Sequence, residues 1–290
     1  MSIVPKDCKL FETLNSLAKS RKMIFLAGLP GTGKSLLLQQ LAILAHGFGR
    51  RPHLLQWDVC RLPFSTNPRV KKYYPERQGI THPGIRKAVG IWSRVAIGNW
   101  AQSHQGEKDI LIGEVPIVGN RLVELIRKEV DSAESILGDC NLTFFGIPVP
   151  SQEVRRSIEK QREERSKKPL HEREKGDAQP KIMYELWKDL VDVAHRFEIL
   201  KKKDVNRVIR AYDPNVYHNT FSILLKHRPT GRIDIDLRLD TKDQSVYELA
   251  VGQKDIVPTE SEVKKAIKTM EDCYPKPEYL EDNVNRWYET

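Results

Sequence analysis

A segment near the N-terminus combines glycines, a lysine and a hydroxyl at a spacing suited to holding a chain of phosphates. Residues 28–35 read Gly-Leu-Pro-Gly-Thr-Gly-Lys-Ser and match the pattern G-x-x-x-x-G-K-S/T in full. Glycines let successive backbone N–H groups turn towards an anion where a Cβ would clash. The lysine ammonium can neutralise phosphate oxygens, and the serine hydroxyl can coordinate Mg²⁺. The candidate nucleotide-binding residues are Gly28, Pro30, Gly31, Thr32, Gly33, Lys34, Ser35 and Leu36.

The residues on either side of this segment predict the strand and the helix that must position it. Residues 23–29 form a short apolar run that ends in glycine, and residues 34–46 carry leucines at helical spacing. The positive end of that helix dipole would face the same phosphate oxygens. With this context the chain resembles the P-loop NTPase superfamily, specifically over about residues 22–47. We expect ATP as the nucleotide, because the sequence contains no guanine-reading N/T-K-x-D pattern.

An acid and an arginine at the end of the second predicted strand are candidates for handling an acceptor. Residues 53–59 read as this strand, and Asp58 and Arg61 stand at its end. The resemblance to small-molecule P-loop kinases implies that Asp58 accepts the proton of the attacking hydroxyl or binds the acceptor, which Arg61 grips. Phosphoryl transfer needs an oriented nucleophile with a base nearby, and cations can hold an anionic acceptor. The alternative is that Asp58 only caps a loop.

The third predicted strand, residues 109–115, carries an acid close to its end. In the P-loop superfamily an acid at this place holds Mg²⁺, usually through water, so the resemblance implies Glu114 and Ser35 as metal-binding residues. The Asp-Glu pair typical of ATP-driven motors and AAA-type ATPases is absent from this strand, which favours transfer to a substrate over hydrolysis. The glycine-rich segment itself nevertheless looks like an AAA phosphate loop. The alternative for Glu114 is a surface acid at a strand end.

The sequence after the third strand contains an arginine with two possible roles. A proline and a glycine at 116 and 119 predict a tight turn that leads into a helix over about residues 119–137. Arg121 stands at the beginning of that helix and could face the acceptor or a phosphate. A plain surface arginine is an equally good interpretation.

A charged segment after the fourth predicted strand supplies further arginines. Residues 151–176 contain nine basic and six acidic residues with few large apolar ones, so we expect them to be mobile or ordered by a ligand. Such a segment resembles the lid of nucleotide and sugar kinases, which supplies arginines to the transition state. On a helix, Arg155 and Arg162 share one face and could reach the same phosphates, with Arg156 in reserve. The alternative is a solvated helix of Glu–Arg pairs.

The order of the predicted elements defines the fold class. Apolar strands followed by helices, with a fourth strand at 141–149, predict an α/β fold: a three-layer P-loop domain with a central parallel sheet. Residues 231–239 and 245–251 form a late strand pair, either a hairpin or a last core strand with an antiparallel edge. The expected divisions are a nucleotide-binding core (1–150), a basic lid (151–180) and an α-rich C-terminal part with the late strands (181–290).

The charge distribution indicates an anionic partner. The 290 residues carry a formal net charge of +9, and residues 50–104 hold ten Lys and Arg against two acids. This segment also contains aromatic residues, of which Trp92 and Trp100 are expected to pack in a helix. Positive charge with aromatic rings suits a phosphorylated or nucleotide-like acceptor and equally suits single-stranded nucleic acid. The best candidates for binding in this segment are Arg61, Arg69, Lys71 and Lys72.

The composition also indicates the cellular compartment in which the protein is expected. No apolar run approaches the roughly 20 residues that a membrane helix needs, and the N-terminus lacks the pattern of a secretory signal. The four cysteines are dispersed and form no CxxC pair, which argues against a zinc site and a disulfide scaffold. We therefore expect a cytoplasmic protein without a membrane partner.

These observations favour a Mg-ATP-dependent phosphotransferase, a kinase, that acts on a small anionic metabolite. Lys34 and the glycine-rich segment would hold ATP, Asp58 would orient the acceptor, and Arg155 and Arg162 would stabilise the transferring charge. Two alternatives remain open. One is a regulatory or nucleic-acid-binding ATPase in which hydrolysis drives a conformational change. The other is a scaffold that binds nucleotide without chemistry.

Overall fold

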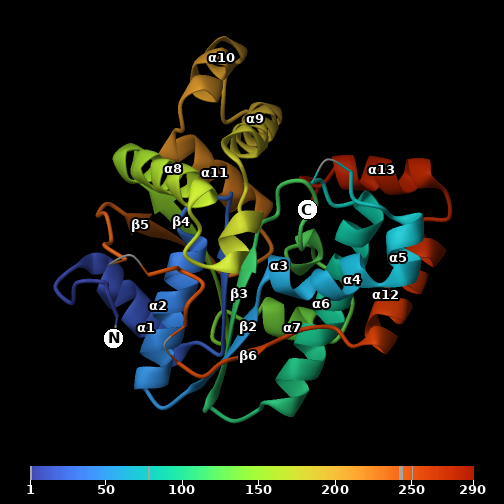
Figure 1. The fold of residues 1–290 in the computed structure, drawn as a ribbon, viewed down its shortest axis with the longest axis horizontal. Coiled ribbons are helices and arrows are strands. Elements are labelled where there is room, and N and C mark those ends of the chain that lie inside the picture. The colour runs from blue at the N-terminus through green and yellow to red at the C-terminus, as the bar shows by residue number, and fades with distance from the viewer. Residues whose placement is uncertain (1, 78, 242–243, 250) are drawn as a thin grey trace.

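A single parallel sheet of six strands organises the chain in the computed structural model, which describes residues 2–77, 79–241, 244–249 and 251–290. The strand order is β5-β4-β1-β3-β2-β6, and every neighbouring pair runs parallel (Figure 1). The strands are β1 (Met23–Ala27), β2 (Arg51–Leu55), β3 (Asp109–Val115), β4 (Thr143–Pro150), β5 (Thr230–Ile235) and β6 (Lys254–Asp255). The α/β class expected from the alternation of strands and helices is therefore confirmed.

Helices cover both faces of the sheet. In β1, Phe25 belongs to a hydrophobic cluster with helices on one face, whereas Ile24 and Leu26 belong to the cluster on the other face. This alternation is the two-residue period of a strand buried on both sides. The helices are α1 (Lys9–Ser20), α2 (Lys34–Gly47), α3 (Trp57–Cys60), α4 (Leu62–Thr66), α5 (Pro68–Tyr73), α6 (Pro83–Ser103), α7 (Glu134–Leu137), α8 (Gln152–Lys167), α9 (Pro180–Arg196), α10 (Lys202–Arg210), α11 (Pro214–Leu224), α12 (Glu260–Cys273) and α13 (Pro277–Asn285), with 3₁₀ turns η1 (Val123–Leu125) and η2 (Glu172–Gly176).

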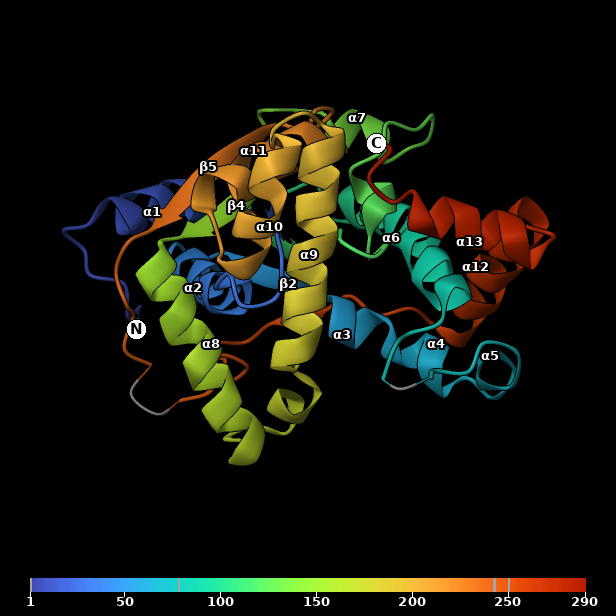
Figure 2. The ribbon, with the colours of Figure 1, turned by 90° about the horizontal axis from the view of Figure 1, so that it is seen from above.

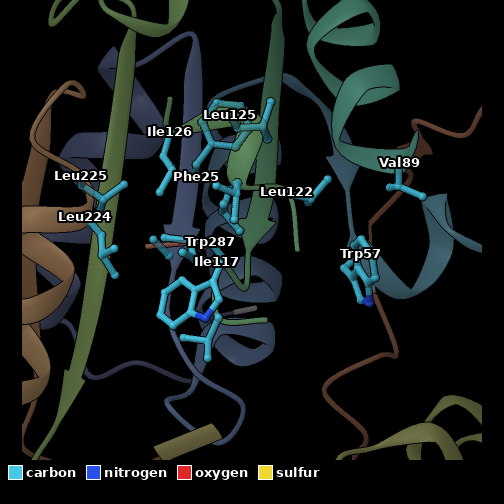
Figure 3. Packing of buried hydrophobic residues seen from close by; sticks show 14 of the residues in the cluster. Phe25, Trp57, Val89, Ile117, Leu122, Leu125, Ile126, Leu224, Leu225 and Trp287 are labelled. Atoms are coloured by element: carbon cyan, nitrogen blue, oxygen red, sulfur yellow. The ribbon is translucent and has the colours of Figure 1, made fainter. Parts of the chain in front are cut away.

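The two clusters draw on different helices. Leucines of α1 and α2 pack on the face reached by Ile24 and Leu26. The other cluster contains residues of α6, α9, α11, α12 and α13, and Figure 3 labels Trp57 and Val89 of α6 among its members. Trp92 and Trp100 are 3% and 6% exposed, which confirms that they pack in the core.

The helix predicted over residues 119–137 is wrong. The backbone there makes a turn in which Ile117, Gly119, Asn120 and Leu122 all have positive φ, between 59° and 75°. Such angles are incompatible with a right-handed helix. Only η1 and the four residues of α7 are helical in this stretch, so Arg121 lies in a turn and not on a helix.

The late strand pair is only partly confirmed. Its first member is β5, which pairs with β4 in parallel and covers the first part of 231–239. The second member is wrong: residues 245–249 and 251 form no strand, and residue 250 lies outside the described residues. The last strand is β6, parallel to β2 at the opposite edge of the sheet. The reason is that the chain after β5 crosses over α2 to reach that edge (Figure 1). Gln39 of α2 donates to the carbonyls of Ser245 and Glu248, which holds this crossover in place.

The charged segment after β4 is ordered as a helix. α8 begins at the Ser151 N-cap, whose hydroxyl accepts from the Val154 N–H, and only Val154 and Arg155 are buried along it. Figure 2 shows α8 and α9 leading away from the sheet and joined through η2. Within the described ranges, no helix has the length and apolar character needed to cross a membrane.

Candidate functional site

The glycine-rich segment forms a loop between β1 and α2. Gly31 and Gly33 have φ of 75° and 86°, in the left-handed region that favours glycine. A Cβ at Gly28 would lie 2.1 Å from the hydroxyl of the fully buried Tyr217, so the close approach of that ring requires glycine there. The N–H groups of Gly31 and Gly33 find no acceptor in the described parts of the chain. We call residues 28–35 the glycine loop.

Lys34 occupies the first turn of α2 and is 7% exposed. Its Nζ donates to the carbonyl of Leu29 at 2.7 Å, and the Thr32 hydroxyl donates to the same carbonyl at 2.9 Å. Burial lowers the pKa of Lys34 to about 8, although the carboxylate of Glu114 acts in the opposite direction. No carboxylate of the described residues lies within ion-pair distance of this ammonium, so its charge is poorly compensated.

One cavity of about 260 Å³ lies against this loop. It is lined by residues from the loop, the ends of β2 and β3, α8, η2 and the segment after β5. The predicted residues that line it are Pro30, Gly31, Gly33, Lys34, Ser35, Leu36, Asp58, Arg61, Glu114, Arg121 and Arg162. Gly28, Thr32 and Arg155 are absent from that lining, so the structure brings together most but not all of the predicted site.

Glu114 lies beside the glycine loop because β3 is the direct neighbour of β1, with Leu26 opposite Glu114 in the register. The carboxyl ends of parallel neighbours meet at one edge of the sheet, where ligands bind in open α/β sheets. Glu114 is 8% exposed, and its Oε1 accepts from the Trp57 N–H at 3.2 Å. Burial raises the pKa of this carboxyl, and the Lys34 ammonium opposes the shift.

Asp58 lies in the first turn of α3, directly after β2, with its side chain 54% exposed. The Arg61 Nε lies 3.6 Å from its Oδ1, and Arg61 Nη1 also pairs with Glu76 at 2.7 Å. Asp58 thus presents an open carboxylate to the cavity, with a guanidinium held next to it by a second acid.

The two arginines predicted on α8 have different surroundings. Arg162 lines the cavity and pairs with Asp177 at 2.7 Å. Arg155 instead donates to the carbonyl of Pro30 at 2.6 Å and pairs with Glu159. Seven residues of helix separate the two by about 10 Å. The prediction that both arginines reach the same phosphates therefore does not fit this arrangement. Arg155 contacts the glycine loop at Pro30 without lining the cavity, whereas Arg162 lines the cavity.

One wall of the cavity contains residues that no sequence motif indicated. Tyr247 donates to Asp177 at 2.6 Å, and Ser245 donates to Glu174 of η2 at 2.7 Å. Arg165, also on α8, pairs with Glu174 at 3.3 Å. Residues 245–251 have the sequence pattern of a strand, so nothing in them indicated that they line a cavity. The one sequence feature that pointed to this part of the cavity was Arg165, three residues after Arg162 on α8.

The remaining candidates in the basic segment lie outside the cavity lining. Arg69 is exposed and pairs with Glu271, and Lys71 and Lys72 are exposed on α5. Of the aromatic residues there, Trp57, Phe64, Trp92 and Trp100 are buried, Tyr74 is half-buried, and Tyr73 is exposed. A row of exposed rings on which nucleic-acid bases could stack is therefore not formed by these residues.

No family model, no curated protein and no solved structure matches this chain.

Proposed function

We propose that the chain is a Mg-ATP-dependent phosphotransferase that acts on a small anionic acceptor. In this proposal the sheet and its helices form a three-layer P-loop domain, with α8 and η2 as a helical lid. One observation carries the proposal. The buried Lys34 ammonium, with no ion-pair partner in the described chain, lies in a glycine loop within one cavity that also holds Ser35, Glu114 and Asp58.

The glycine loop offers a triphosphate both donors and charge. The first N–H groups of a helix have no intrahelical partner, so those of Lys34 and Ser35 at the beginning of α2 are free to bind an anion. Lys34 adds a full positive charge at the same place. A polyanion supplies the compensation that the protein does not give this ammonium.

Ser35 and Glu114 are the residues that would hold Mg²⁺. Both are hard oxygen donors that line the cavity beside Lys34, and hard oxygen ligands are those that Mg²⁺ prefers. When bound, the ion would neutralise charge on the phosphates and orient them. Glu114 is followed by Val115, which is fully buried, so the end of β3 has no second acid to polarise a water for hydrolysis.

Asp58 is the residue that would accept the proton of the attacking hydroxyl. Both acids line the cavity, but the Asp58 side chain is half exposed whereas Glu114 is buried, so they have different environments suited to different roles. Arg162 would stabilise charge on the transferring phosphoryl group, as arginines do in phosphoryl transfer. The apolar wall formed by Ile158, Ile235 and Leu237 would receive the nucleobase.

Release of ADP from Mg-ATP, screened over a library of phosphorylated and carboxylated metabolites, tests this function. We expect one class of acceptor to accelerate release with wild type, and Asp58→Asn to lower that rate by about 100-fold or more while ATP affinity stays within a few-fold. Asp204→Asn, on the distant α10, is the matched control and should behave as wild type. ADP release that no acceptor accelerates, or equal rates with Asp58→Asn and wild type, would contradict the proposal.

A further inference from the structure

The turn after β3 is a strained piece of backbone beside the cavity. We call residues 116–122 the post-β3 turn. Of the four non-glycine residues with positive φ in the described chain, Ile117, Asn120 and Leu122 lie in it, with φ of 59° to 60°. Residues held in this region persist only where the surroundings fix them, and they gather at ligand clamps and active sites. Here the surroundings are the hydrophobic core, in which Ile117 and Leu122 are fully buried, so the turn is held rigidly beside the cavity.

Two arginines converge on this turn. Arg121 Nη1 donates to the Val118 carbonyl at 2.8 Å, and Arg86 of α6 donates to the carbonyl of Gly119. A Cβ at Gly119 would lie 3.2 Å from Nη1 of Arg121 and 3.4 Å from Nη1 of Arg86. Two guanidinium groups from distant parts of the sequence thus approach one point, and glycine at 119 leaves room for both.

Neither guanidinium has a carboxylate partner within ion-pair distance in the described ranges, and the Nε of Arg86 has no hydrogen-bond acceptor there. Two buried arginines elsewhere differ: Arg94 pairs with Asp131 at 2.6 Å, and Arg228 pairs with Glu134 at 2.8 Å. Burial and the nearby Arg121 lower the pKa of Arg86 to about 10. The pKa of Arg121 is also lowered by burial, although Asp58 opposes this shift.

Two neighbouring cations without an anion are costly unless a ligand neutralises them. Two guanidinium groups carry the charge that a phosphate dianion balances, whereas a carboxylate would balance only one of them. Their planar sets of N–H donors also match phosphate oxygens.

We propose that the post-β3 turn recognises a phosphomonoester group, bound between Arg86 and Arg121, on the molecule that enters the cavity. That this molecule is the phosphoryl acceptor rests on the function proposed above. Arg121 and Asp58 line the same cavity, so a phosphate held at the turn would leave the rest of the acceptor extending towards Asp58. Arg86 is then a binding residue that the sequence pattern did not reveal.

Calorimetric titration with glycerol phosphate at pH 8 tests the site in a Lys34→Ala background, where the glycine loop has lost its ammonium. We expect binding to persist in this background and to weaken about 10-fold or more with added Arg86→Gln or Arg121→Gln. Arg207→Gln, on the exposed side of α10, is the matched control and should leave affinity unchanged. Acetate and glycerol, tested in the same way, should bind more weakly than the phosphate ester.

Thermal unfolding without ligand separates a binding role from a structural one. Each Arg→Gln change removes a positive charge that has no carboxylate partner together with one hydrogen bond to a turn carbonyl, so we expect the melting temperature to change little. A lower melting temperature with unchanged ester affinity would assign the arginines to the fold and overturn the proposal. Equal ester affinity in the Arg86, Arg121 and Arg207 variants, no ester binding at all, or acetate binding as tight as the ester would overturn the proposal. Because these titrations contain no ATP, they are independent of whether the glycine loop binds nucleotide.

Discussion

At the scale of single residues, the Lys34 ammonium is the clearest sign of what the cavity binds. It is held by the Leu29 carbonyl inside a loop whose glycines are required by their φ values, and burial lowers its pKa to about 8. A protein that only needed stability at this place would do better with an apolar side chain. The retained charge is accounted for by a ligand that brings negative charge.

The lowered pKa of Lys34 predicts how stability depends on pH. In the unfolded chain this lysine has its ordinary pKa of 10.5, so between pH 8 and 10.5 the unfolded state binds more protons than the folded state. Stability contributed at this site therefore rises with pH across that window.

Urea unfolding of wild type and Lys34→Met checks this prediction. The difference in the free energy of unfolding, wild type minus variant, should increase from pH 8 to 10.5 by an amount on the order of a few kcal/mol. The comparison removes the contribution of other lysines and tyrosines that titrate in the same range. A difference that is flat or that falls with pH would show that Lys34 is not desolvated as described.

At the scale of elements, α8 carries one arginine that faces the cavity and another that does not. Arg162 faces the cavity and is held by Asp177, whereas the exposed Arg156 is on the same helix without lining the cavity. We expect Arg162→Gln to lower the rate of phosphoryl transfer by about 100- to 1000-fold with little change in ATP affinity, because the arginine would act on charge that develops during transfer. Arg156→Gln should have no effect on steady-state kinetics. If only Arg156→Gln lowered the rate, the arginine that stabilises the transferring charge would be Arg156, which would contradict the role proposed for Arg162.

The N-terminus of α12 gives a prediction that is independent of function. The Thr259 hydroxyl accepts from the Glu262 N–H, and the Glu262 carboxylate accepts from the Thr259 N–H at 2.8 Å, which makes a capping box. Thr259→Ala should lower the free energy of unfolding by about 1 kcal/mol in chemical denaturation. Because α12 packs against α6 and contributes no residue to the cavity, nucleotide binding should be unchanged. An unchanged free energy of unfolding would mean that this cap does not hold the helix end.

At the scale of the whole molecule, the concentrated positive charge in the sequence is partly compensated by folding. Four of the ten basic residues of segment 50–104 pair with acids that are distant in sequence. The pairs are Arg51–Asp109, Arg69–Glu271, Lys87–Glu124 and Arg94–Asp131. A count along the chain could not show this, since charge balance depends on which segments the fold brings together. Arg121, which lines the cavity, and Arg86, which meets it at the post-β3 turn, have no carboxylate partner among the described residues, so this end of the cavity is where an anion would be most favoured.

The parts that the sequence could predict are those determined by local patterns. The glycine loop, its flanking strand and helix, and the acid on β3 follow from spacing and periodicity over short distances. The post-β3 turn was mistaken for a helix because its positive φ angles fall on residues such as Leu122 that usually avoid them. The wall of the cavity that includes Tyr247 depends on a crossover to the far edge of the sheet, and the order of strands is a long-range property. The contact between Arg86 of α6 and the post-β3 turn could not be predicted either, because it also depends on how distant segments pack.

Isothermal titration of the protein with ATP in the presence of Mg²⁺ tests the central claim most directly. We expect saturable binding by wild type, a loss of about 100-fold or more in affinity with Lys34→Ala, and unchanged affinity with Lys264→Ala on the exposed face of α12. Absence of binding by wild type, or equal affinity in wild type and Lys34→Ala, would contradict it.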